Sequence, residues 1–317
     1  MSAATSSACW PPSSPDTWST GPAATPSRSW SRELCSWPAR GSPGRCRGTR
    51  CSRHRPTERA LVHSTGEKVN DVYTLDVLVR GFPGTTRTHG GLGWCSVSVL
   101  RDGTRTVVVD AGPPAYQEMV LRELEQRGIS TSDVTDVLTT HLHWDHIGNF
   151  TMFPNAIFTV GRVELEWSAQ QPPETPLVAD LHVRRLLELG DRVRTVDDGG
   201  EVVPGITAIA VPGHTPGHMC FRATVAGGDV LFAGDSVKNR YELATGDVHS
   251  SLDFEASRAS VERLRALMEQ DPSIVMVPGH DVPLAWVNGE VTATEPLNAE
   301  LSVYLDTHDD PDSQTFM

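Results

Sequence analysis

From Val69 onward the chain alternates short apolar runs with glycine, aspartate and proline, a pattern typical of buried strands separated by tight turns. Stretches with apolar residues three or four positions apart interrupt these runs and predict amphipathic helices. We expect strands over 72–79, 95–100, 106–110, 133–140, 156–160, 193–196, 206–211, 220–225, 229–233 and 273–277, and helices over 115–127, 161–168, 180–189 and 254–269. The sequence has neither a dinucleotide-binding glycine fingerprint nor a phosphate loop. The order predicts two stacked sheets with helices outside them, in one domain over residues 69–317.

Residues 1–68 have a different composition, rich in serine, proline, arginine, glycine and tryptophan and poor in aliphatic residues. Such a segment cannot bury enough apolar surface to offset the entropy of ordering, so we predict that it is disordered. Tryptophan and cysteine are unusual in functional disordered tails, which favours a misassigned start codon over a basic interaction arm. N-terminal sequencing of the native protein would reject a misassigned start by finding Met1.

Charge is unevenly divided along the chain, whose formal net charge is −13. Residues 1–68 hold 10 of the 27 basic and 4 of the 40 acidic residues, so the remainder carries −19. An acidic body repels phosphate backbones, which disfavours nucleic acid as a partner. The sequence has no run of 18 apolar residues and no signal-peptide pattern, so we expect a cytoplasmic protein that does not enter a membrane. A homo-oligomer is compatible with the sequence.

The residues after one predicted strand concentrate metal-ligand types, since Thr-His-Leu-His-Trp-Asp-His-Ile-Gly-Asn spans 140–149. Strand alternation sends His141 and His143 to the same side, while Asp145 and His146 lie where the chain leaves the strand. A lone histidine is more often ordinary polar surface than a ligand, but four candidate ligands so close together favour a metal site. This geometry suits two metal ions in one site with a common opening. Such a site needs more than four protein ligands, so other segments must supply the rest.

Three later segments place a ligand type at a glycine turn after an apolar strand. They are Val-Pro-Gly-His-Thr-Pro-Gly-His over 211–218, Phe-Ala-Gly-Asp over 232–235 and Val-Pro-Gly-His-Asp over 277–281. Glycine permits the close backbone turns that such positions need, so these strand ends can deliver further ligands to one edge. On physical grounds either His214 or His218 could serve in the first segment.

Taken in order, His-x-His-x-Asp-His, Pro-Gly-His-Thr-Pro-Gly-His, Gly-Asp and Pro-Gly-His resemble the motifs of the metallo-β-lactamase fold superfamily, in its glyoxalase II and lactonase-like branch. The resemblance extends from Val72 to Pro283. It implies an α+β fold, an αββα sandwich in which two mixed β-sheets pack face to face with helices on the outer faces.

The resemblance also implies a dinuclear metal centre. Its ligands divide between two metals and one bridging carboxylate: His141, His143 and His214 for the first metal, Asp145, His146 and His280 for the second, and Asp235 for the bridge. His214 is preferred over His218 because the family register makes the first histidine of the pair the ligand. His218 and Asp110 are then expected beside the ligands, where such groups orient them. Zinc is the expected metal, although histidine and carboxylate ligands also accept iron and manganese.

The implied activity is hydrolysis of a carboxylic ester, lactone or thioester of a small molecule by a hydroxide that bridges the metals. Asp145 or Asp235 would orient the hydroxide and pass a proton to the leaving group. Asp235 stands where the commonest zinc β-lactamases carry cysteine, which disfavours β-lactams, and the short acidic tail disfavours glutathione thioesters. Phosphodiester or RNA cleavage is the first alternative. Oxygenation by a single iron is the second.

Two segments are candidates for substrate contact. Lactonases carry tyrosine where this chain has Lys238, and Tyr241 lies further along the same expected loop, so a lactone substrate stays open. Trp167 precedes a proline-rich loop, and the insertion over 170–189 is a lid candidate because loops near a site commonly carry specificity. A solvated charged loop and a surface helix with ordinary core residues are the competing interpretations.

Overall fold

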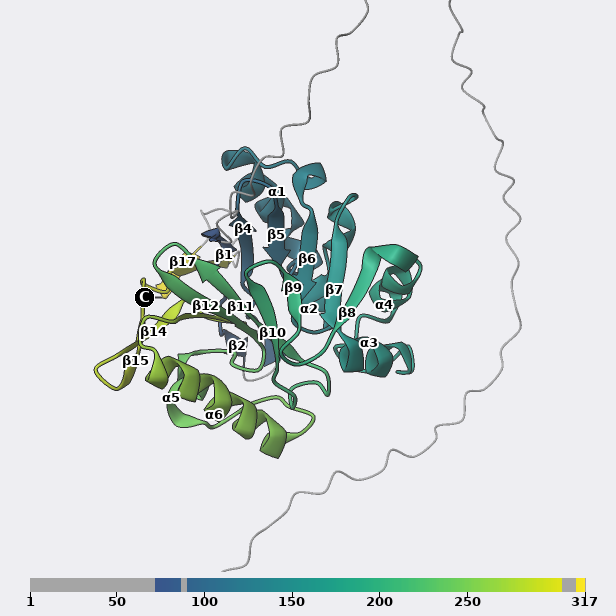
Figure 1. The fold of residues 1–317 in the computed structure, drawn as a ribbon. Helices are drawn as coiled ribbons and strands as arrows, with labels where there is room; N and C mark the ends of the chain where they lie inside the picture. Colours follow the sequence, from purple (N-terminus) through teal and green to yellow (C-terminus); the bar gives the residue numbers. More distant parts are fainter. Residues whose placement is uncertain (1–71, 87–89, 304–311, 317) are drawn as a thin grey trace, which may run out of the picture. The chain divides into compact units, whose positions relative to one another are not determined.

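The computed structural model describes residues 72–86, 90–303 and 312–316, so the predicted segment 1–68 lies outside the described residues. Most of the described strands form two sheets (Figure 1). In hydrogen-bonded order, the first sheet consists of β1 (Thr74–Val79), β4 (Val97–Arg101), β5 (Thr106–Val109), β6 (Asp136–Thr139), β7 (Ile157–Gly161) and β8 (Val193–Val196). The second consists of β15 (Glu290–Ala293), β14 (Leu284–Val287), β13 (Val275–Pro278), β12 (Gly228–Gly234), β11 (Met219–Val225), β10 (Ile206–Ala210) and β9 (Glu201–Val203). Two separate pairs join β2 (Thr85–Thr86) to β3 (Gly90–Gly91) and β16 (Ala299–Val303) to β17 (Asp312–Phe316).

Helices connect and cover the strands. The α-helices of the described chain are α1 (Gln117–Gln126), α2 (Trp144–Ile147), α3 (Arg162–Ala169), α4 (Asp180–Leu187), α5 (Arg240–Thr245) and α6 (Phe254–Gln270). Short 3-10 turns occupy Pro114–Tyr116, Thr131–Asp133, Phe150–Met152 and Gly190–Arg192. Neighbours from β5 to β8 pair in parallel, as do β12 and β13, and each parallel step crosses over through at least one of these helices. The remaining neighbours in both sheets are antiparallel, so both sheets are mixed.

Strand alternation divides the apolar residues into layers. In β5, Val107 and Val109 belong to a core shared with Phe221 and Phe232 of the second sheet, whereas Val108 belongs to the core under the helices of the first half. This is the period of two that sends successive side chains to opposite faces. The inner core therefore lies between two sheets packed face to face.

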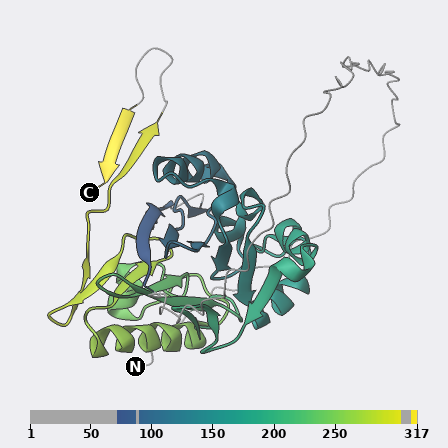
Figure 2. The ribbon, with the colours of Figure 1, turned by 45° about the horizontal axis from the view of Figure 1, so that its top comes forward.

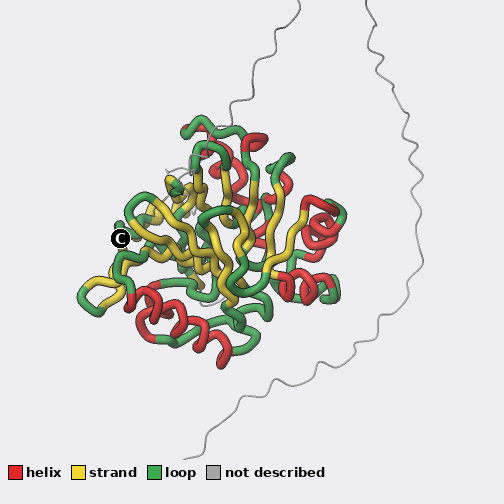
Figure 3. Tube along the Cα trace, in the orientation of Figure 1, coloured by secondary structure: helices red, strands yellow, loops and turns green. Residues whose placement is uncertain are grey.

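The outer faces are covered by the helices (Figure 3). Val120 and Leu124 of α1 pack in the outer core of the first sheet. On the other side Val261, Leu264 and Met268 of α6 pack against the second sheet, along which α6 lies in Figure 2. The predicted αββα sandwich is thus confirmed. No helix among the described residues is long and apolar enough to cross a membrane.

Some predicted boundaries were wrong for local reasons. The strand expected over 133–140 begins only at Asp136, because the Ser130 and Asp133 side chains form a capping box around a 3-10 turn. The loop expected to carry Tyr241 is partly helical, because the Asn239 side chain accepts a hydrogen bond from the Glu242 N–H and starts α5. The strands β9, β14 and β15 were also missed, and β9 has only three residues, too few to show a period.

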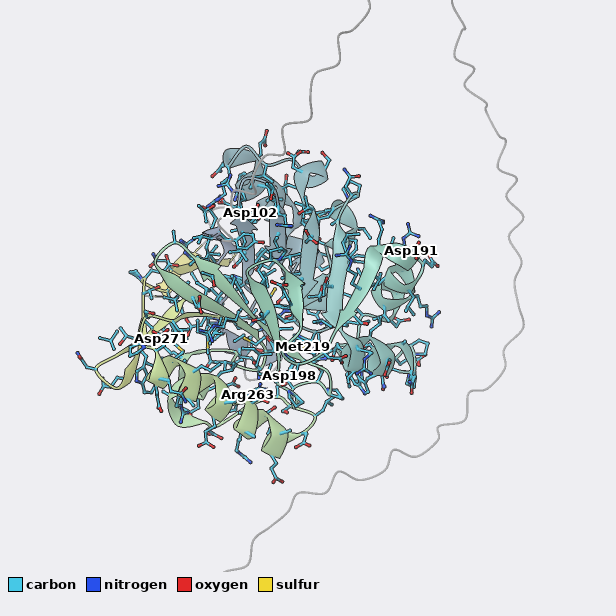
Figure 4. All side chains as sticks on the ribbon, in the orientation of Figure 1. Asp102, Asp191, Asp198, Met219, Arg263 and Asp271 are labelled. Carbon is cyan, nitrogen blue, oxygen red and sulfur yellow. The ribbon has the colours of Figure 1, made fainter. Side chains whose placement is uncertain are left out.

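The two sheets meet near the ends of β6 and β11. The Met219 N–H, at the start of β11, donates to the Thr140 carbonyl oxygen at 2.9 Å (Met219 is labelled in Figure 4). The turn after β8 is tied to α6 by an ion pair of 3.1 Å between Asp198 and Arg263, also labelled in Figure 4. The first contact holds the residues after β6 against the start of β11, and the second joins the two sheets' connecting turn to α6.

Candidate metal centre

The central strand β6 delivers the first cluster of predicted ligands. The chain leaves β6 after Thr139 and turns into α2, with His143 at the N-cap position and His146 inside the helix. The His141 and His146 side chains are completely buried. The strand ends before His141, so His141 and His143 lie in the loop beyond β6 and their positions follow from the loop rather than from strand alternation.

Three imidazoles form the first group of candidate ligands. The Nδ1 atom of His143 lies 3.0 Å from Nε2 of His141 and 3.0 Å from Nε2 of His214. Two ligands on one tetrahedral zinc, each at about 2.0–2.1 Å, lie roughly 3.3 Å apart. The separations are therefore those of nitrogens directed at one point, and this group could hold one metal ion.

The second group of candidate ligands is Asp145, His146 and His280, two of which are partly exposed to solvent. Nε2 of His280 lies 3.5 Å from Oδ2 of Asp145, and Nε2 of His146 lies 3.6 Å from the same oxygen. The side chains of His280 and Asp145 are 14% and 16% exposed, which identifies their side of the centre as its opening to solvent. These three residues could hold a second metal ion.

Asp235 lies between the two groups. Its Oδ2 is 3.3 Å from Nε2 of His214, and its Oδ1 is 3.2 Å from Nε2 of His146 and 3.1 Å from Nε2 of His280. One carboxylate oxygen therefore faces each group. Asp235 follows β12, and its neighbour Gly234 has a φ of 49°, so the chain turns sharply at the strand end.

The protonation pattern of His146 tests whether a cation fits. His146 Nδ1 lies 2.8 Å from Oδ2 of Asp110, so a proton on Nδ1 is shared with that carboxylate. In that tautomer Nε2 presents a lone pair toward Oδ1 of Asp235, and both buried atoms lack a hydrogen-bond partner within the described residues. Two acceptors 3.2 Å apart are stabilised by a cation between them, so the donor set fits a metal ion.

Electrostatics separates the imidazoles into two classes. Burial lowers the pKa of His143 to about 3 and that of His214 to about 4, so both are neutral, the form that binds metal. Burial also lowers the pKa of His146, but the carboxylates around it outweigh this effect and raise the pKa well above its usual value. Burial would raise the pKa of Asp235, yet the adjacent imidazoles, first that of His280, lower it well below the ordinary range. The carboxylates around His146 thus favour a positive charge between Nε2 and Asp235, which either a proton on Nε2 or a bound metal ion can supply.

Asp110 contacts both a candidate ligand and the backbone at the end of β6. Besides His146 it accepts hydrogen bonds through Oδ1 from the Thr140 N–H at 2.9 Å. Its φ of 54° lies in the left-handed region, which aspartate tolerates better than most residues. His218, the other residue expected beside the ligands, accepts from the Asp235 N–H through Nε2 at 3.0 Å and stacks on His141. This contact leaves His214 as the member of the pair directed at His143.

Two contacts that sequence reasoning missed also orient the ligands. Nδ1 of His214 donates to the Ser250 carbonyl oxygen at 2.8 Å, which leaves Nε2 as the acceptor atom. The Cys95 thiol donates to the Asp145 carbonyl oxygen at 3.0 Å. Both partners are far from the ligands in sequence, and a backbone carbonyl carries no sequence signature. No local pattern could therefore have identified them.

The residues predicted to contact substrate occupy varied positions. Lys238 is nearly buried, and its ammonium pairs with the fully buried Glu242 carboxylate at 3.2 Å. Tyr241 is half-exposed and donates to Asp247 at 3.1 Å. Trp167 packs against the outer core of the first sheet. A role in substrate contact stays a prediction for all three, although the Lys238 pair and the Trp167 packing favour structural roles.

The insertion over 170–189 does reach the centre. The Ala179 N–H donates to the Leu142 carbonyl oxygen, and His143 forms a bridge with Val178. The same segment contains α4, which packs on the first sheet through Val183. The insertion therefore borders the first group of ligands and is anchored to the core.

A hollow of about 400 Å³ lies elsewhere, at the amino ends of β12 and β13, and Tyr73, Val225 and Ser273 are among its lining residues. Asp235 and His280 follow the carboxyl ends of the same two strands. This hollow contains none of the candidate ligands.

Comparison with known proteins bears on this geometry. Residues 90–280 match the family model of the metallo-beta-lactamase superfamily. The chain belongs to the metallo-beta-lactamase superfamily. The predicted family is thereby confirmed.

Relatives within the metallo-beta-lactamase superfamily include lactonases. The chain is 27% identical over 167 residues to an N-acyl homoserine lactonase of a Bacillus species, a match that covers 52% of this chain but only 63% of the lactonase. It is 29% identical over 229 residues to metallo-beta-lactamase domain-containing protein 1 of Xenopus laevis, covering 71% of this chain and 88% of that protein. The dizinc quorum-quenching lactonase AidC, solved with the product N-hexanoyl-L-homoserine, shares the fold with a TM-score of 0.55, at 15% identity over 64% of this chain and 80% of that chain.

The contact between Asp110 and His146 can be tested by substitution. Asp110→Asn keeps an oxygen for the Thr140 N–H and tolerates the positive φ, but it places an NH₂ group against Nδ1 of His146. His146 must then change tautomer and turn a proton toward Asp235. We expect metal affinity to fall about 10- to 100-fold, measured by competition with a chromophoric chelator. Asp198→Asn, at the surface, should leave it unchanged; equal affinities in the two variants would contradict the orienting role.

Proposed function

We propose that this protein is a dinuclear metal-dependent hydrolase that cleaves a carboxylic ester, lactone or thioester of a small molecule. The observation that carries the proposal is the position of Asp235, with one carboxylate oxygen 3.3 Å from His214 and the other 3.2 and 3.1 Å from His146 and His280. A carboxylate so placed could serve both ions of a dinuclear centre, and paired metal ions are typical of hydrolytic sites.

The two groups of ligands differ in what they offer. His141, His143 and His214 would hold one ion in a closed, neutral site, and Asp145, His146 and His280 would hold the other at the solvent-accessible side. When bound, the ions would supply a water of lowered pKa as nucleophile and polarise the substrate carbonyl. Zinc remains the expected metal, since nitrogen and oxygen ligands of this kind suit it, although they also suit iron and manganese.

The carboxylates would handle the proton. Both oxygens of Asp235 face imidazoles, whereas Asp145 is contacted through Oδ2 by His146 and His280 and is partly open to solvent. Asp145 is thus the group better placed to accept a proton from the attacking water and return it to the leaving oxygen. Neither step needs a serine or cysteine nucleophile, and the Cys95 thiol is fully buried with a pKa raised, first by burial, well above its usual value.

The surface beside the centre suits a substrate with an apolar part. Trp144 and Leu177 are 45% and 49% exposed, and the Trp144 N–H donates to the Leu177 carbonyl oxygen, so these side chains belong to neighbouring backbone segments next to the ligands. Such apolar surface beside polar ligands is typical of small-molecule sites. The lactonases among the relatives support an acyl substrate. A cytoplasmic location stays a separate prediction.

Metal analysis combined with a substrate panel tests the proposal. The purified chain should contain about two divalent ions, as hydrolases with paired metals do. It should hydrolyse at least one ester, lactone or thioester, and Asp145→Asn should lower turnover strongly, whereas Asp198→Asn should not. A chain without divalent metal would overturn the proposal. So would cleavage confined to phosphodiesters, or oxygen consumption with a single iron.

A further inference from the structure

Glu164 of α3 is a buried carboxylate that belongs to neither group of ligands. Its side chain has no exposed surface. Oε1 accepts a hydrogen bond from the Leu142 N–H at 3.0 Å, and Oε2 accepts one from the Gly217 N–H at 3.2 Å. Both donors are backbone groups of the loops that carry the candidate ligands.

The two N–H donors each lie close in sequence to candidate ligands of the first group. Leu142 lies between His141 and His143, and Gly217 lies in the turn that begins with His214. One carboxylate therefore holds both loops from which the first group of ligands projects. The second group depends on α2 and on the loops after β12 and β13, which Glu164 does not contact through these hydrogen bonds.

Close packing beside Glu164 fixes how near the loop with His214 and Gly217 lies to α3. A Cβ on Gly217 would overlap the backbone nitrogen of Glu164, and a Cβ on Gly161 would overlap the Gly217 carbonyl oxygen. The loop after β10 is thus pressed directly against the first turn of α3. Only glycine allows so close an approach, and the approach is what brings the Gly217 N–H within reach of the carboxylate.

The location is costly for a charged group. Burial raises the pKa of Glu164 to about 7, which reflects the unfavourable free energy of placing a carboxylate out of contact with water. An apolar side chain would fill the same space without this cost, but the two N–H groups would then be buried without partners. A glutamate here matches the need to satisfy two backbone donors at once.

We propose that Glu164 is a positioning residue that sets the distance between the His141–His143 loop and the His214 turn, and thereby the affinity of the first metal group. The inference rests on the proposed metal centre, but it does not depend on which bond the protein cleaves. Outer groups that orient metal ligands commonly change affinity by about 10- to 100-fold when they are replaced.

Glu164→Gln tests the inference. The amide keeps one acceptor oxygen but turns an NH₂ group toward the other N–H donor, so only one loop can be held. Graded chelation followed by metal analysis should show the first ion lost at about 10-fold lower chelator concentration, with the second ion unchanged. The visible spectrum of the cobalt-loaded protein should change for one site only. Glu166→Gln is the matched control, since Glu166 lies on the same helix, is 60% exposed and pairs only weakly with Arg162 at 3.7 Å.

The outcomes separate positioning from a general structural role. Lower thermal stability with unchanged metal affinity, or equal weakening of both ions, would overturn the inference. Should Glu164→Gln fail to fold, Glu164→Asp makes the same test, because its shorter side chain keeps the charge but cannot reach both donors. A wild-type chain that binds metal but cleaves no substrate of the panel would overturn the proposed function alone. One that binds no metal would overturn both.

Discussion

Asp235→Ala should abolish hydrolysis and lower the metal content of the protein. The substitution removes the only carboxylate whose two oxygens face both groups of ligands among the described residues. It also leaves three imidazoles without the negative charge that offsets them. Loss of several kcal/mol of transition-state stabilisation corresponds to a fall in kcat/KM of about 10³-fold or more. Steady-state kinetics with metal analysis on the same samples checks both parts.

Two controls sharpen this result. Asp235→Asn keeps the size of the side chain but offers one oxygen, so it should retain one ion and lose most activity. Asp198→Ala removes a carboxylate that pairs with Arg263 at the surface and should behave as wild type in both assays. Retention of both ions and of normal turnover by Asp235→Ala would show that the carboxylate is not a bridge.

Gly213→Ala should strongly lower the free energy of unfolding. Gly213 precedes His214, has a φ of 134°, and a Cβ there would overlap the backbone nitrogen of Ser257 in α6. The Gly213 carbonyl oxygen also accepts from the Leu252 and Asp253 N–H groups. Backbone strain and overlap together should lower the free energy of unfolding by about 3 kcal/mol or more, visible as a lower urea midpoint with an unchanged slope.

Gly227→Ala separates the two causes. Gly227 has a φ of 110° but open space where its Cβ would lie. Its substitution reports backbone strain alone, about 1–2 kcal/mol, and leaves the metal centre intact. Metal affinity should fall only in Gly213→Ala, because that change moves the backbone of His214 and the first turn of α6. Equal destabilisation by the two substitutions would argue against the contact with Ser257.

Local patterns marked the segments that carry ligand types, because each follows an apolar run, whereas the choice of seven ligands and their division between two metals came from the family resemblance. Alternation was expected to place His141 and His143 on one side, but both lie beyond the end of β6 at Thr139. Glycine turns marked Asp235 and His280. The structure brings all seven predicted ligands together. Short elements such as α2 and β9 escaped prediction because they contain too few residues to show a period.

Glu164 shows why the rest could not be predicted. It lies between the exposed Val163 and the partly buried Leu165, so in sequence it looks like an ordinary charge on a surface helix. Its burial results from contact with Gly217, which is 53 residues away. The same holds for Ser250, whose carbonyl contacts His214 from 36 residues away. Such contacts depend on the packing of distant segments and leave no local signal.

The topology has a consequence for how the protein acquires its centre during folding. Every strand of the first sheet precedes residue 197, and every strand of the second follows it. The first half of the chain supplies His141, His143, Asp145 and His146, whereas His214, Asp235 and His280 come from the second. Neither half alone carries all seven candidate ligands, so the complete centre would form only when the two halves dock. Metal ions held by ligands from both halves would then resist the separation of the two sheets, and metal removal would lower the free energy of unfolding.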